Sequence, residues 1–395
     1  MQFSEEQKVA LERIGEFPFY RPMFMGGYAG TGKTTVLAEL LRRYGRDKIM
    51  FLAPTGKACH VLKQKMPNAD VRTIHSALYS AHEISELDLE EYRRRGEEGD
   101  EASMRLYEYY TRKDALRVKF TLSPTPELFT RLVVVDEASM VARKEYSNLV
   151  DVTQKLLFVG DPAQLPPVES PSILPDTFDV FLKKVHRAAL ESPITRLAME
   201  IRRGEFKGWH KWIKEGVPVI HDFRKATFKA AYQILTMKRV TRAYVNRRMR
   251  HELFNGIVVP GLTEGEKIIV RQNRKLGEGR FLVNGDIGTV IHRSKEKKDT
   301  ITVKFTEDEH TFRFSDEELQ QNYGDGIPVY PRQPYNVRID YGYAVTVHAS
   351  QGSEWGKVLL CDDGMWAWRE EQRRKLLYTA VTRAKQKLVV FDARG

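Results

Sequence analysis

Apolar segments of strand length alternate with amphipathic helical stretches near the start of the chain. An apolar segment from Met23 to Gly26 runs into a glycine-rich turn, and Thr34 to Tyr44 continues with the periodicity of a helix. The apolar segment KIMFLAP and a helical stretch from Lys57 to Met66 follow. This β-α-β-α order predicts an α/β fold with a parallel sheet. Ahead of it, Ser4 and Gln7 have the spacing of a capping box and predict a short N-terminal helix.

The composition of the chain changes after about residue 80. From Ala81 to about Asp114 it is highly charged and holds no apolar strand, which predicts solvated helices inserted into the sheet domain. The short segment RVKFTL after it predicts a strand. The apolar residues of RLVVVDEASM and KLLFVGD are then typical of central strands in a parallel sheet.

A second unit is predicted to begin near Phe178. It contains an amphipathic helix (ESPITRLAMEIRRG), a strand (YQILTM) and the basic helix RAYVNRRMRHEL. Short alternating segments separated by turn residues fill residues 264–341, which is the pattern of a small β barrel. The α/β pattern returns in YAVTVHASQG, KVLLCDD and KLVVFDA. Two α/β units therefore follow one another, and the second contains a β-rich insertion.

Composition narrows the class of protein. The 395 residues suffice for two or three compact units, and 42% hydrophobic with 30% charged residues is typical of a folded globular chain. No apolar run approaches the roughly 18 residues that a membrane span needs, so we expect no membrane partner. The acids of MQFSEEQKVALERIGEF argue against a signal peptide. Cys59 and Cys361 are the only cysteines, so we expect a reducing setting, the cytoplasm of a bacterial or phage-infected cell.

The charge balance suggests a class of partner without fixing it. The net charge is +11, from 64 Lys and Arg against 53 Asp and Glu. Such a surplus suits a polyanion, because each neutralised phosphate releases counterions. Many basic proteins bind no nucleic acid, so the charge alone leaves both interpretations open.

The glycine-rich turn carries the most specific chemistry. Residues 27–34, GYAGTGKT, fit the G-x-x-x-x-G-K-T pattern of a phosphate-binding loop and lie between a strand and a helix. Gly27, Gly30 and Gly32 let backbone N–H groups turn toward phosphate oxygens at the positive end of the helix dipole. Lys33 is expected to reach the β and γ phosphates, and the Thr34 hydroxyl to hold Mg²⁺. A chance glycine turn is the alternative that this context disfavours.

Polar residues end the two apolar strands that follow. Asp136 and Glu137 close LVVV at the carboxyl edge of the predicted sheet, where ligands bind in open α/β folds. We expect Asp136 to hold Mg²⁺ and Glu137 to act as the base toward water. Gln164, in GDPAQLPP, is placed to sense the γ phosphate or the attacking water, although in isolation this segment would be an ordinary Pro-rich turn.

Seven motifs in a fixed order resemble superfamily 1B helicases, and within them the RecD-like and phage Dda-like group. They are GYAGTGKTT, APTGKAC, TIHSAL, VVVDEASM, GDPAQLPPV, YAVTVHASQGSEW and YTAVTRAK. The resemblance runs from Gln7 to Lys385 and leaves only the charged stretch from Ala81 without a clear counterpart. It implies two RecA-like P-loop NTPase domains with ATP between them.

The resemblance also implies roles for individual residues at the ATP site. Gln7 would recognise adenine, Thr31 and Thr35 would complete the phosphate loop, and Gly352 and Glu354 would lie near the nucleotide. Arg187 and Arg383, from the second domain, would contact the γ phosphate, although either could be an ordinary surface arginine. A cation brought across a cleft stabilises the charge that develops in phosphoryl transfer.

Further positions match those that touch the DNA backbone in the family. They are Thr55, Lys57, Thr73 and His75 in the first domain and Asn246, Thr346 and His348 in the second. Hydroxyls and amides at loop tips suit phosphate contacts that do not read sequence. His75 and His348 could equally be structural histidines, and the basic helix around Asn246 could be a solvated face.

The resemblance also implies structures for the two insertions. The region of Val118–Leu122 would form a pin that splits the duplex, with Phe120 or Tyr110 as a candidate wedge, although a hairpin packed on the sheet is the alternative. Residues 264–341 would form an SH3-like barrel. The predicted domains are 1–78 and 126–177 (RecA-like 1A), 79–125 (inserted 1B pin region), 178–263 and 342–395 (RecA-like 2A), and 264–341 (2B insertion).

Together these features predict an ATP- and Mg²⁺-dependent DNA helicase that moves along single-stranded DNA, with a 5′-to-3′ direction that rests on the resemblance. Single-stranded DNA and single-strand/duplex junctions are the expected partners, with single-strand-binding or replication proteins as candidates, and one chain is expected to suffice. A nucleic-acid-binding ATP switch or clamp that does not unwind is the alternative. A small-molecule kinase is disfavoured, because it would leave the second α/β unit without a role. Replication, recombination and repair stay open.

Overall fold

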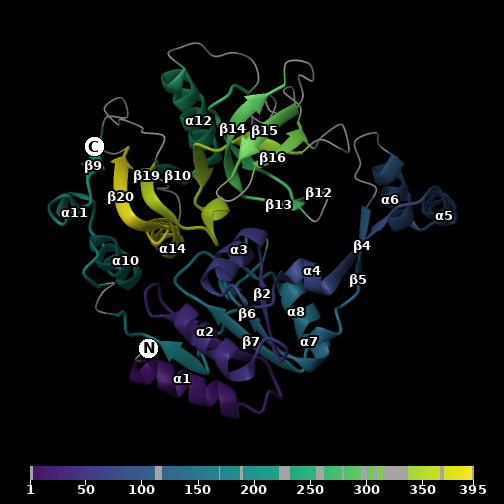
Figure 1. The fold of residues 1–395 in the computed structure, drawn as a ribbon, viewed down its shortest axis with the longest axis horizontal. Coiled ribbons are helices and arrows are strands. Elements are labelled where there is room, and N and C mark those ends of the chain that lie inside the picture. Colours follow the sequence, from purple (N-terminus) through teal and green to yellow (C-terminus); the bar gives the residue numbers. More distant parts are fainter. Residues whose placement is uncertain are drawn as a thin grey trace.

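The computed structural model describes residues 3–111, 118–168, 170–186, 190–221, 232–254, 262–277, 280–294, 300–305, 309–314, 337–364 and 369–393. Two helix-flanked parallel sheets confirm the α/β prediction (Figure 1). The predicted Arg187 and the end of the charged stretch, at 112–114, lie outside the described residues.

The first domain is built on a six-stranded parallel sheet in the order β3-β2-β6-β7-β1-β8. Its strands are β1 (Met23–Gly27), β2 (Ile49–Ala53), β3 (Val71–Thr73), β6 (Leu132–Val135), β7 (Lys155–Gly160) and β8 (Val180–Leu182). Its helices are α1 (Glu5–Glu16), α2 (Lys33–Tyr44), α3 (Gly56–Lys65), α4 (Ile74–Leu78), α7 (Glu127–Thr130) and α8 (Arg143–Val152), with a 3-10 turn, η1, at Ala138–Met140.

Apolar residues cover both faces of this sheet. One core cluster joins the strands to α1, α2 and α3, and a second joins them to α4, α7 and α8. The capping box is confirmed: the Ser4 Oγ accepts from the Gln7 backbone N–H, and the Gln7 Oε1 accepts from the Ser4 N–H. Because β1, β7 and β6 are adjacent, the loops after them meet at one edge of the sheet.

The predicted boundary at 177/178 is wrong by one strand. β8 pairs in parallel with β1, with Met25 opposite Val180 and Gly27 opposite Leu182. Val180 and Leu182 are buried in the first domain's core, so the chain leaves that sheet only after Leu182. A three-residue strand at a sheet edge gives too short an apolar signal for the sequence to assign it.

An insertion follows α4 at the far end of the first domain (Figure 1). β4 (Tyr79–Glu83) pairs antiparallel with β5 (Val118–Leu122), from Tyr79 opposite Leu122 to Glu83 opposite Val118. Between them lie α5 (Glu86–Glu97) and α6 (Glu101–Thr111), which pack around a small cluster of their own. The predicted solvated helices and the RVKFTL strand are confirmed.

The second domain holds a five-stranded parallel sheet in the order β18-β10-β19-β20-β9. Its strands are β9 (Val219–Ile220), β10 (Gln233–Thr236), β18 (Ala344–Thr346), β19 (Trp355–Asp362) and β20 (Ala384–Asp392). Its helices are α10 (Pro193–Arg203), α11 (His210–Lys214), α12 (Arg239–Leu253) and α14 (Glu370–Val381), with the 3-10 turn η2 at His348–Ser350. One core cluster links α10, α11 and α14 to the sheet, and another joins α12 to the inserted strands.

The insertion in the second domain is antiparallel, as the alternation predicts. A five-stranded sheet runs in the order β16-β15-β14-β11-β17, beside a separate two-stranded pair of β12 and β13. The bounds are β11 (Lys267–Val270), β12 (Arg274–Gly277), β13 (Arg280–Leu282), β14 (Ile287–Arg293), β15 (Thr300–Lys304), β16 (Glu309–Arg313) and β17 (Ile339–Tyr341). Closure into a barrel remains a prediction. No described helix is long and apolar enough to cross a membrane.

Candidate active site

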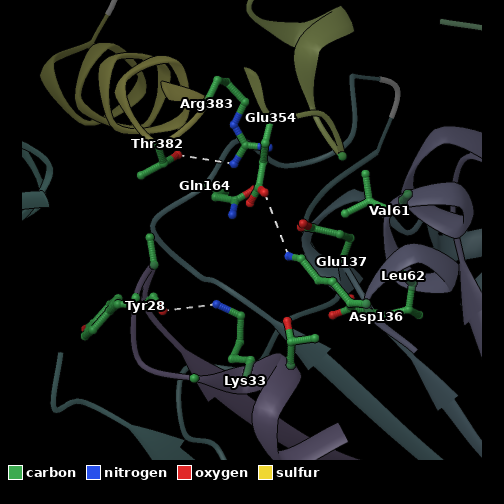
Figure 2. A pocket seen from close by; sticks show the side chains of 17 residues that line it. Tyr28, Lys33, Val61, Leu62, Asp136, Glu137, Gln164, Glu354, Thr382 and Arg383 are labelled. Atoms are coloured by element: carbon green, nitrogen blue, oxygen red, sulfur yellow. Dashed lines mark hydrogen bonds and ion pairs between the residues drawn. The ribbon is translucent and has the colours of Figure 1, made fainter. Parts of the chain in front are cut away.

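A cleft between the two domains gathers most of the residues predicted for the ATP site (Figure 2). Its predicted lining residues are Gly30, Gly32, Lys33, Thr34, Asp136, Glu137, Gln164, Gly352, Glu354 and Arg383. The first seven come from the loops after β1, β6 and β7 and from the start of α2, all in the first domain. The last three come from the loop after η2 and the end of α14 in the second domain. Residues far apart in sequence therefore face one space.

The loop after β1 has the backbone that a phosphate cradle needs. Gly30 and Gly32 have φ of +78° and +80°, a left-handed region that favours glycine. The Thr31 hydroxyl is buried and donates to the Tyr28 carbonyl at 2.8 Å, which braces the turn. Lys33 Nζ donates to the carbonyls of Gly27 (2.7 Å) and Tyr28 (3.1 Å), at the floor of the cleft. Its ammonium group thus lies among the loop's oxygen atoms.

Gln7 contacts the same loop from behind. Its Nε2 lies 3.4 Å from the carbonyl oxygens of Thr31 and Gly32, and 3.1 Å from His186 Nε2. Gln7 is buried and is not among the residues that line the cleft. Its amide therefore ties α1 to the phosphate loop, in addition to capping the helix.

The paired carboxylates lie at the end of β6, as predicted. Burial and the neighbouring Glu137 carboxylate raise the pKa of Asp136 to about 6, and the Lys33 ammonium opposes that rise. Glu137 has φ +54° and ψ +40°, which is left-handed although it is not a glycine. Such a backbone costs on the order of 1–3 kcal/mol and clusters at active sites. The strain directs the Glu137 side chain into the cleft (Figure 2).

Gln164 and Arg383 face the cleft from opposite domains (Figure 2). The Gln164 Oε1 is buried and has no hydrogen-bond partner among the described residues. The Arg383 guanidinium is also buried and donates to Thr379 O (3.0 Å), Ser353 O (3.1 Å) and Thr382 Oγ1 (3.2 Å). The arginine is thus held rigidly by its own domain while it points toward the phosphate loop.

Glu354 forms ion pairs with two lysines that the sequence did not single out. Its Oε2 lies 2.9 Å from Lys385 Nζ and 3.8 Å from Lys65 Nζ, which belongs to α3 of the first domain. Burial would raise the pKa of Glu354, but the cations Lys65, Lys385 and Arg383 outweigh it and lower that pKa. Lys65 was missed because it is one of several exposed cations on its helix, and only the domain arrangement brings it to Glu354.

The predicted DNA contacts of the first domain are scattered. Thr55 and Thr73 are the N-caps of α3 and α4, and their hydroxyls accept from Ala58 N and Ser76 N. The His75 ring lies tilted against Tyr79, with ring centroids 4.8 Å apart, and edge-on to Phe120, with centroids 4.5 Å apart. Both threonines therefore have local structural roles, and His75 joins α4 to the β4–β5 hairpin.

Lys57 lies against the second domain rather than in open solvent. Its Nζ donates to Gly285 O at 3.1 Å and lies 4.9 Å from the centre of the Trp355 ring. Burial lowers the pKa of Lys57 to about 8, although Asp286 opposes the shift. In this arrangement its ammonium group contacts the turn before β14, so a phosphate contact would require the turn to move.

Asn246 departs from the prediction. It is 1% exposed, and its amide bonds to the backbone on every side. Nδ2 donates to Tyr341 O and Ala344 O, both at 3.2 Å, and Oδ1 accepts from Ala344 N at 2.8 Å. Asn246 therefore joins α12 to the strands at the root of the insertion and has no group left for DNA.

Thr346 and His348 line a second cavity between the domains, with Pro167, Arg239 and Lys375 among its other walls. The Thr346 Oγ1 accepts from Ala349 N at 3.3 Å. Burial, with Arg239 nearby, lowers the pKa of His348, which favours its neutral form. This cavity lies where the segment after Gln164 meets β18.

The comparisons with known proteins agree with this geometry. A family model described as an AAA domain matches residues 2–217, more than half of the chain, and a UvrD-like helicase C-terminal domain model matches residues 341–391. The ATP-dependent RecD2 DNA helicase of Deinococcus radiodurans is 26% identical, over 97% of this chain and 48% of its own length. The RecBCD enzyme subunit RecD of Mycolicibacterium smegmatis is 27% identical, over 93% of this chain and 67% of its own.

Solved structures share the fold. A Pif1 helicase from a structure that addresses unwinding at forked DNA has a TM-score of 0.58 and 18% identity, covering 99% of this chain and 92% of that one. The structure of Bacteroides Pif1 bound to single-stranded DNA has a TM-score of 0.57 and 18% identity, and it covers the same shares of both chains. These likenesses support the prediction of two RecA-like domains. The chain spans about half the length of the RecD2 protein.

The family model, the RecD relatives and the order of the motifs agree. The chain therefore belongs to the AAA domain family and is a RecD-like member of helicase superfamily 1B.

Proposed function

We propose that this protein is an ATP-dependent DNA helicase that moves along single-stranded DNA in the 5′-to-3′ direction and separates a duplex ahead of it. The observation that carries the proposal is the shared cleft. Lys33, Glu137 and Gln164 enter it from one domain, and Arg383 enters it from the other. A site divided in this way is complete only when the domains are closed, so nucleotide turnover and domain movement are coupled.

The assigned roles follow the chemistry of each group. The loop from Gly27 to Thr35 would hold the phosphates with Lys33, Glu137 would position and deprotonate the attacking water, and Gln164 would sense the γ phosphate. Arg383, and Arg187 by resemblance, would neutralise charge on the transferred phosphoryl group. Gly352 and Glu354 would lie near the nucleotide, and Gln7, to which the resemblance gives adenine recognition, would also hold the phosphate loop in place.

The donor set suits Mg²⁺. The Thr34 hydroxyl and the Asp136 carboxylate line the same cleft, and the raised pKa of Asp136 reflects its burial and the adjacent Glu137 carboxylate. Mg²⁺ binds through one or two protein oxygens together with waters and substrate phosphates, so this small set is adequate. When bound, the ion would neutralise the β and γ phosphate oxygens.

DNA would cross both domains on the side of Thr55, Thr73, His75, Thr346 and His348. Lys57 would join them only after it leaves Gly285. Asn246 is not part of this proposal. We further propose that the β4–β5 hairpin acts as a pin with Phe120, which is 54% exposed, as the candidate wedge, and that the inserted antiparallel sheet is an SH3-like barrel. Apart from the shift of one boundary to 182/183, the proposed domains are those predicted from the sequence.

The proposal is tested by ATP hydrolysis with and without single-stranded DNA. We expect DNA to stimulate turnover, and Lys33→Ala or Glu137→Gln to abolish it while DNA binding persists. Substantial DNA-stimulated hydrolysis by Glu137→Gln would remove Glu137 from its role. Activity without any response to DNA would argue against a nucleic-acid motor altogether.

A further inference from the structure

One tyrosine hydroxyl lies where the two domains meet beside the phosphate loop. Tyr378, on α14 of the second domain, donates to the Asp161 Oδ2 at 2.7 Å. The Tyr378 hydroxyl oxygen in turn accepts a hydrogen bond from the Ala29 backbone N–H at 2.9 Å. Tyr378 is 2% exposed and Asp161 is fully buried. The hydroxyl therefore bridges a backbone amide of the phosphate loop and a carboxylate at the end of β7.

Asp161 also binds the turn that contains Gln164. Its other oxygen, Oδ1, accepts from the Ala163 N–H at 3.0 Å. The far end of the same turn is tied to the second domain as well. Leu165 N donates to Thr379 Oγ1 at 3.0 Å, and Gln351 Nε2 donates to Leu165 O at 2.9 Å. The segment from Asp161 to Leu165 is thus fastened at both ends to groups of the second domain.

The helix that carries Tyr378 also sets the arginine. Arg383 Nε donates to the Thr379 carbonyl at 3.0 Å, so Thr379 contacts Leu165 through its hydroxyl and Arg383 through its carbonyl. Consecutive residues of one helical turn therefore hold the phosphate loop, the Gln164 turn and the arginine. A shift of α14 relative to the first domain would break the contacts of Tyr378 and Thr379 with that domain and would carry Arg383 along with the helix.

The chemistry of the phenol suits this position. It offers one O–H donor and an acceptor oxygen, and both are used. Burial and the nearby Asp161 carboxylate raise the pKa of Tyr378 well above its usual value, so the hydroxyl keeps its proton. Without this hydroxyl, the half-buried Ala29 N–H and the buried Asp161 carboxylate would each lose a hydrogen bond. Groups left unsatisfied in this way are costly, so the closed arrangement would be disfavoured.

We propose that Tyr378 is a positioning residue that couples closure of the two domains to the phosphate loop and to Gln164. It does not touch the reacting atoms. It sets where the loop, Gln164 and Arg383 stand relative to one another, so its loss would lower turnover more than it lowers nucleotide binding. The inference rests on the proposed ATP turnover at this cleft. The alternative is a buried contact that contributes only to stability.

The test compares Tyr378→Phe with Tyr343→Phe. Each variant removes one hydroxyl from a buried tyrosine, but the Tyr343 hydroxyl accepts from Lys267 N within the second domain, away from the cleft. For Tyr378→Phe we expect kcat with single-stranded DNA to fall by about ten- to a hundred-fold, as misplacement of catalytic groups does, while KM for ATP changes far less. We expect Tyr343→Phe to keep both kinetic parameters near the wild-type values.

Two further readouts separate coupling from stability. The ratio of single-stranded DNA affinities with and without a non-hydrolysable ATP analogue should move toward one in Tyr378→Phe, because that ratio measures the coupling free energy. Deuterium exchange of the peptide containing Ala29 should become faster in Tyr378→Phe and stay unchanged in Tyr343→Phe.

Wild-type kcat, affinity ratio and exchange in a folded Tyr378→Phe variant would overturn the inference. Equal losses in Tyr378→Phe and Tyr343→Phe that follow their melting temperatures would also overturn it. If the wild-type protein hydrolyses no ATP, the proposed function fails instead, and exchange at Ala29 still decides whether the contact between the domains exists.

Discussion

Arg383 illustrates how much depends on the placement of a single charge. Its three hydrogen-bond acceptors all belong to the second domain, so the domain holds the guanidinium before any nucleotide is bound. Preorganised cations of this kind act chiefly on the transition state, because they need no reorganisation when charge develops. Arg383 should therefore matter more for turnover than for affinity.

We predict that Arg383→Ala lowers kcat by roughly a thousand-fold, in the range known for arginines that enter a phosphoryl-transfer site. The dissociation constant of ATP should change by only a few-fold. Lys387→Ala, which removes an exposed cation from the neighbouring strand β20, is the matched control and should behave as the wild type. Steady-state kinetics and equilibrium nucleotide binding measure the two effects. Equal losses in both would indicate a misfolded second domain and remove the assigned role.

Residues whose function depends on local sequence were predictable. Gly30, Gly32 and Lys33 follow from a strand–loop–helix pattern, and Asp136 with Glu137 follows from the end of an apolar strand. Residues whose role depends on the other domain were not. Nothing near Tyr378 in the sequence indicates that its hydroxyl reaches Ala29, and nothing near Lys57 indicates Gly285 as its partner.

Asn246 is a residue for which the sequence predicted a DNA contact and the structure shows a role inside the domain. A polar residue on a basic helix suits DNA, and only the packing of α12 against β17 and β18 shows that its amide is used up inside the domain. Gln7 likewise has a capping role that the sequence predicts and a contact with Gly32 that it does not. Side-chain direction on a helix is readable from spacing, but the partner element is not.

At the scale of elements, the contact between α3 and the turn before β14 should depend on pH. Burial lowers the pKa of Lys57 to about 8 from its usual 10.5. Between those two values the unfolded chain binds more protons than the folded protein, so stability from this group rises as pH increases through that window. Burial also lowers the pKa of Lys267 to about 8, with Lys57 adding to the shift, so part of the rise is expected from that residue too.

We therefore predict that the free energy of unfolding rises more steeply from about pH 7.5 to 9.5 in the wild type than in Lys57→Met, because the variant lacks the Lys57 ammonium group and keeps only the contribution of Lys267. Lys63→Met removes an exposed cation from the same helix and should follow the wild-type curve. Urea titrations at the two pH values measure the difference. Parallel curves for the wild type and Lys57→Met would show that Lys57 is not buried against Gly285.

The α5–α6 pair has a hydrophobic core of its own. Its core, with Ile84, Leu89, Tyr92 and Tyr110, is separate from those of the two sheet domains, and it projects from the end of the β4–β5 hairpin (Figure 1). Glu83 lies directly opposite Val118, so a two-residue turn can join these strands without changing their register.

We predict that replacing residues 84–117 by an Asn-Gly turn changes the melting temperature of the protein by no more than about 4 °C, equivalent to roughly 1 kcal/mol. DNA-stimulated ATP hydrolysis should be retained, because the deletion lies far from the cleft. Calorimetry and steady-state kinetics check this. A large loss of stability would mean that the helical pair supports the first domain, and a loss of hydrolysis alone would give it a part in activation by DNA.

At the scale of the whole molecule, the two parallel sheets, their order along the chain and the two insertions follow from the alternation of apolar and polar segments. What that alternation did not determine is how the domains meet. The contacts of Tyr378, Leu165 and Lys57 join residues 349, 214 and 228 positions away in the chain. These contacts make the cleft a shared site, and a shared site is what a motor requires.

Strand displacement from tailed duplexes tests the central claim most directly. One substrate carries a 5′ single-stranded tail and the other a 3′ tail, and each is incubated with the protein in the presence of ATP and Mg²⁺. The account predicts ATP-dependent displacement from the 5′-tailed duplex, none from the 3′-tailed duplex, and none from either with Glu137→Gln. Vigorous DNA-stimulated hydrolysis without displacement from either substrate would contradict it and would indicate an ATP-driven clamp.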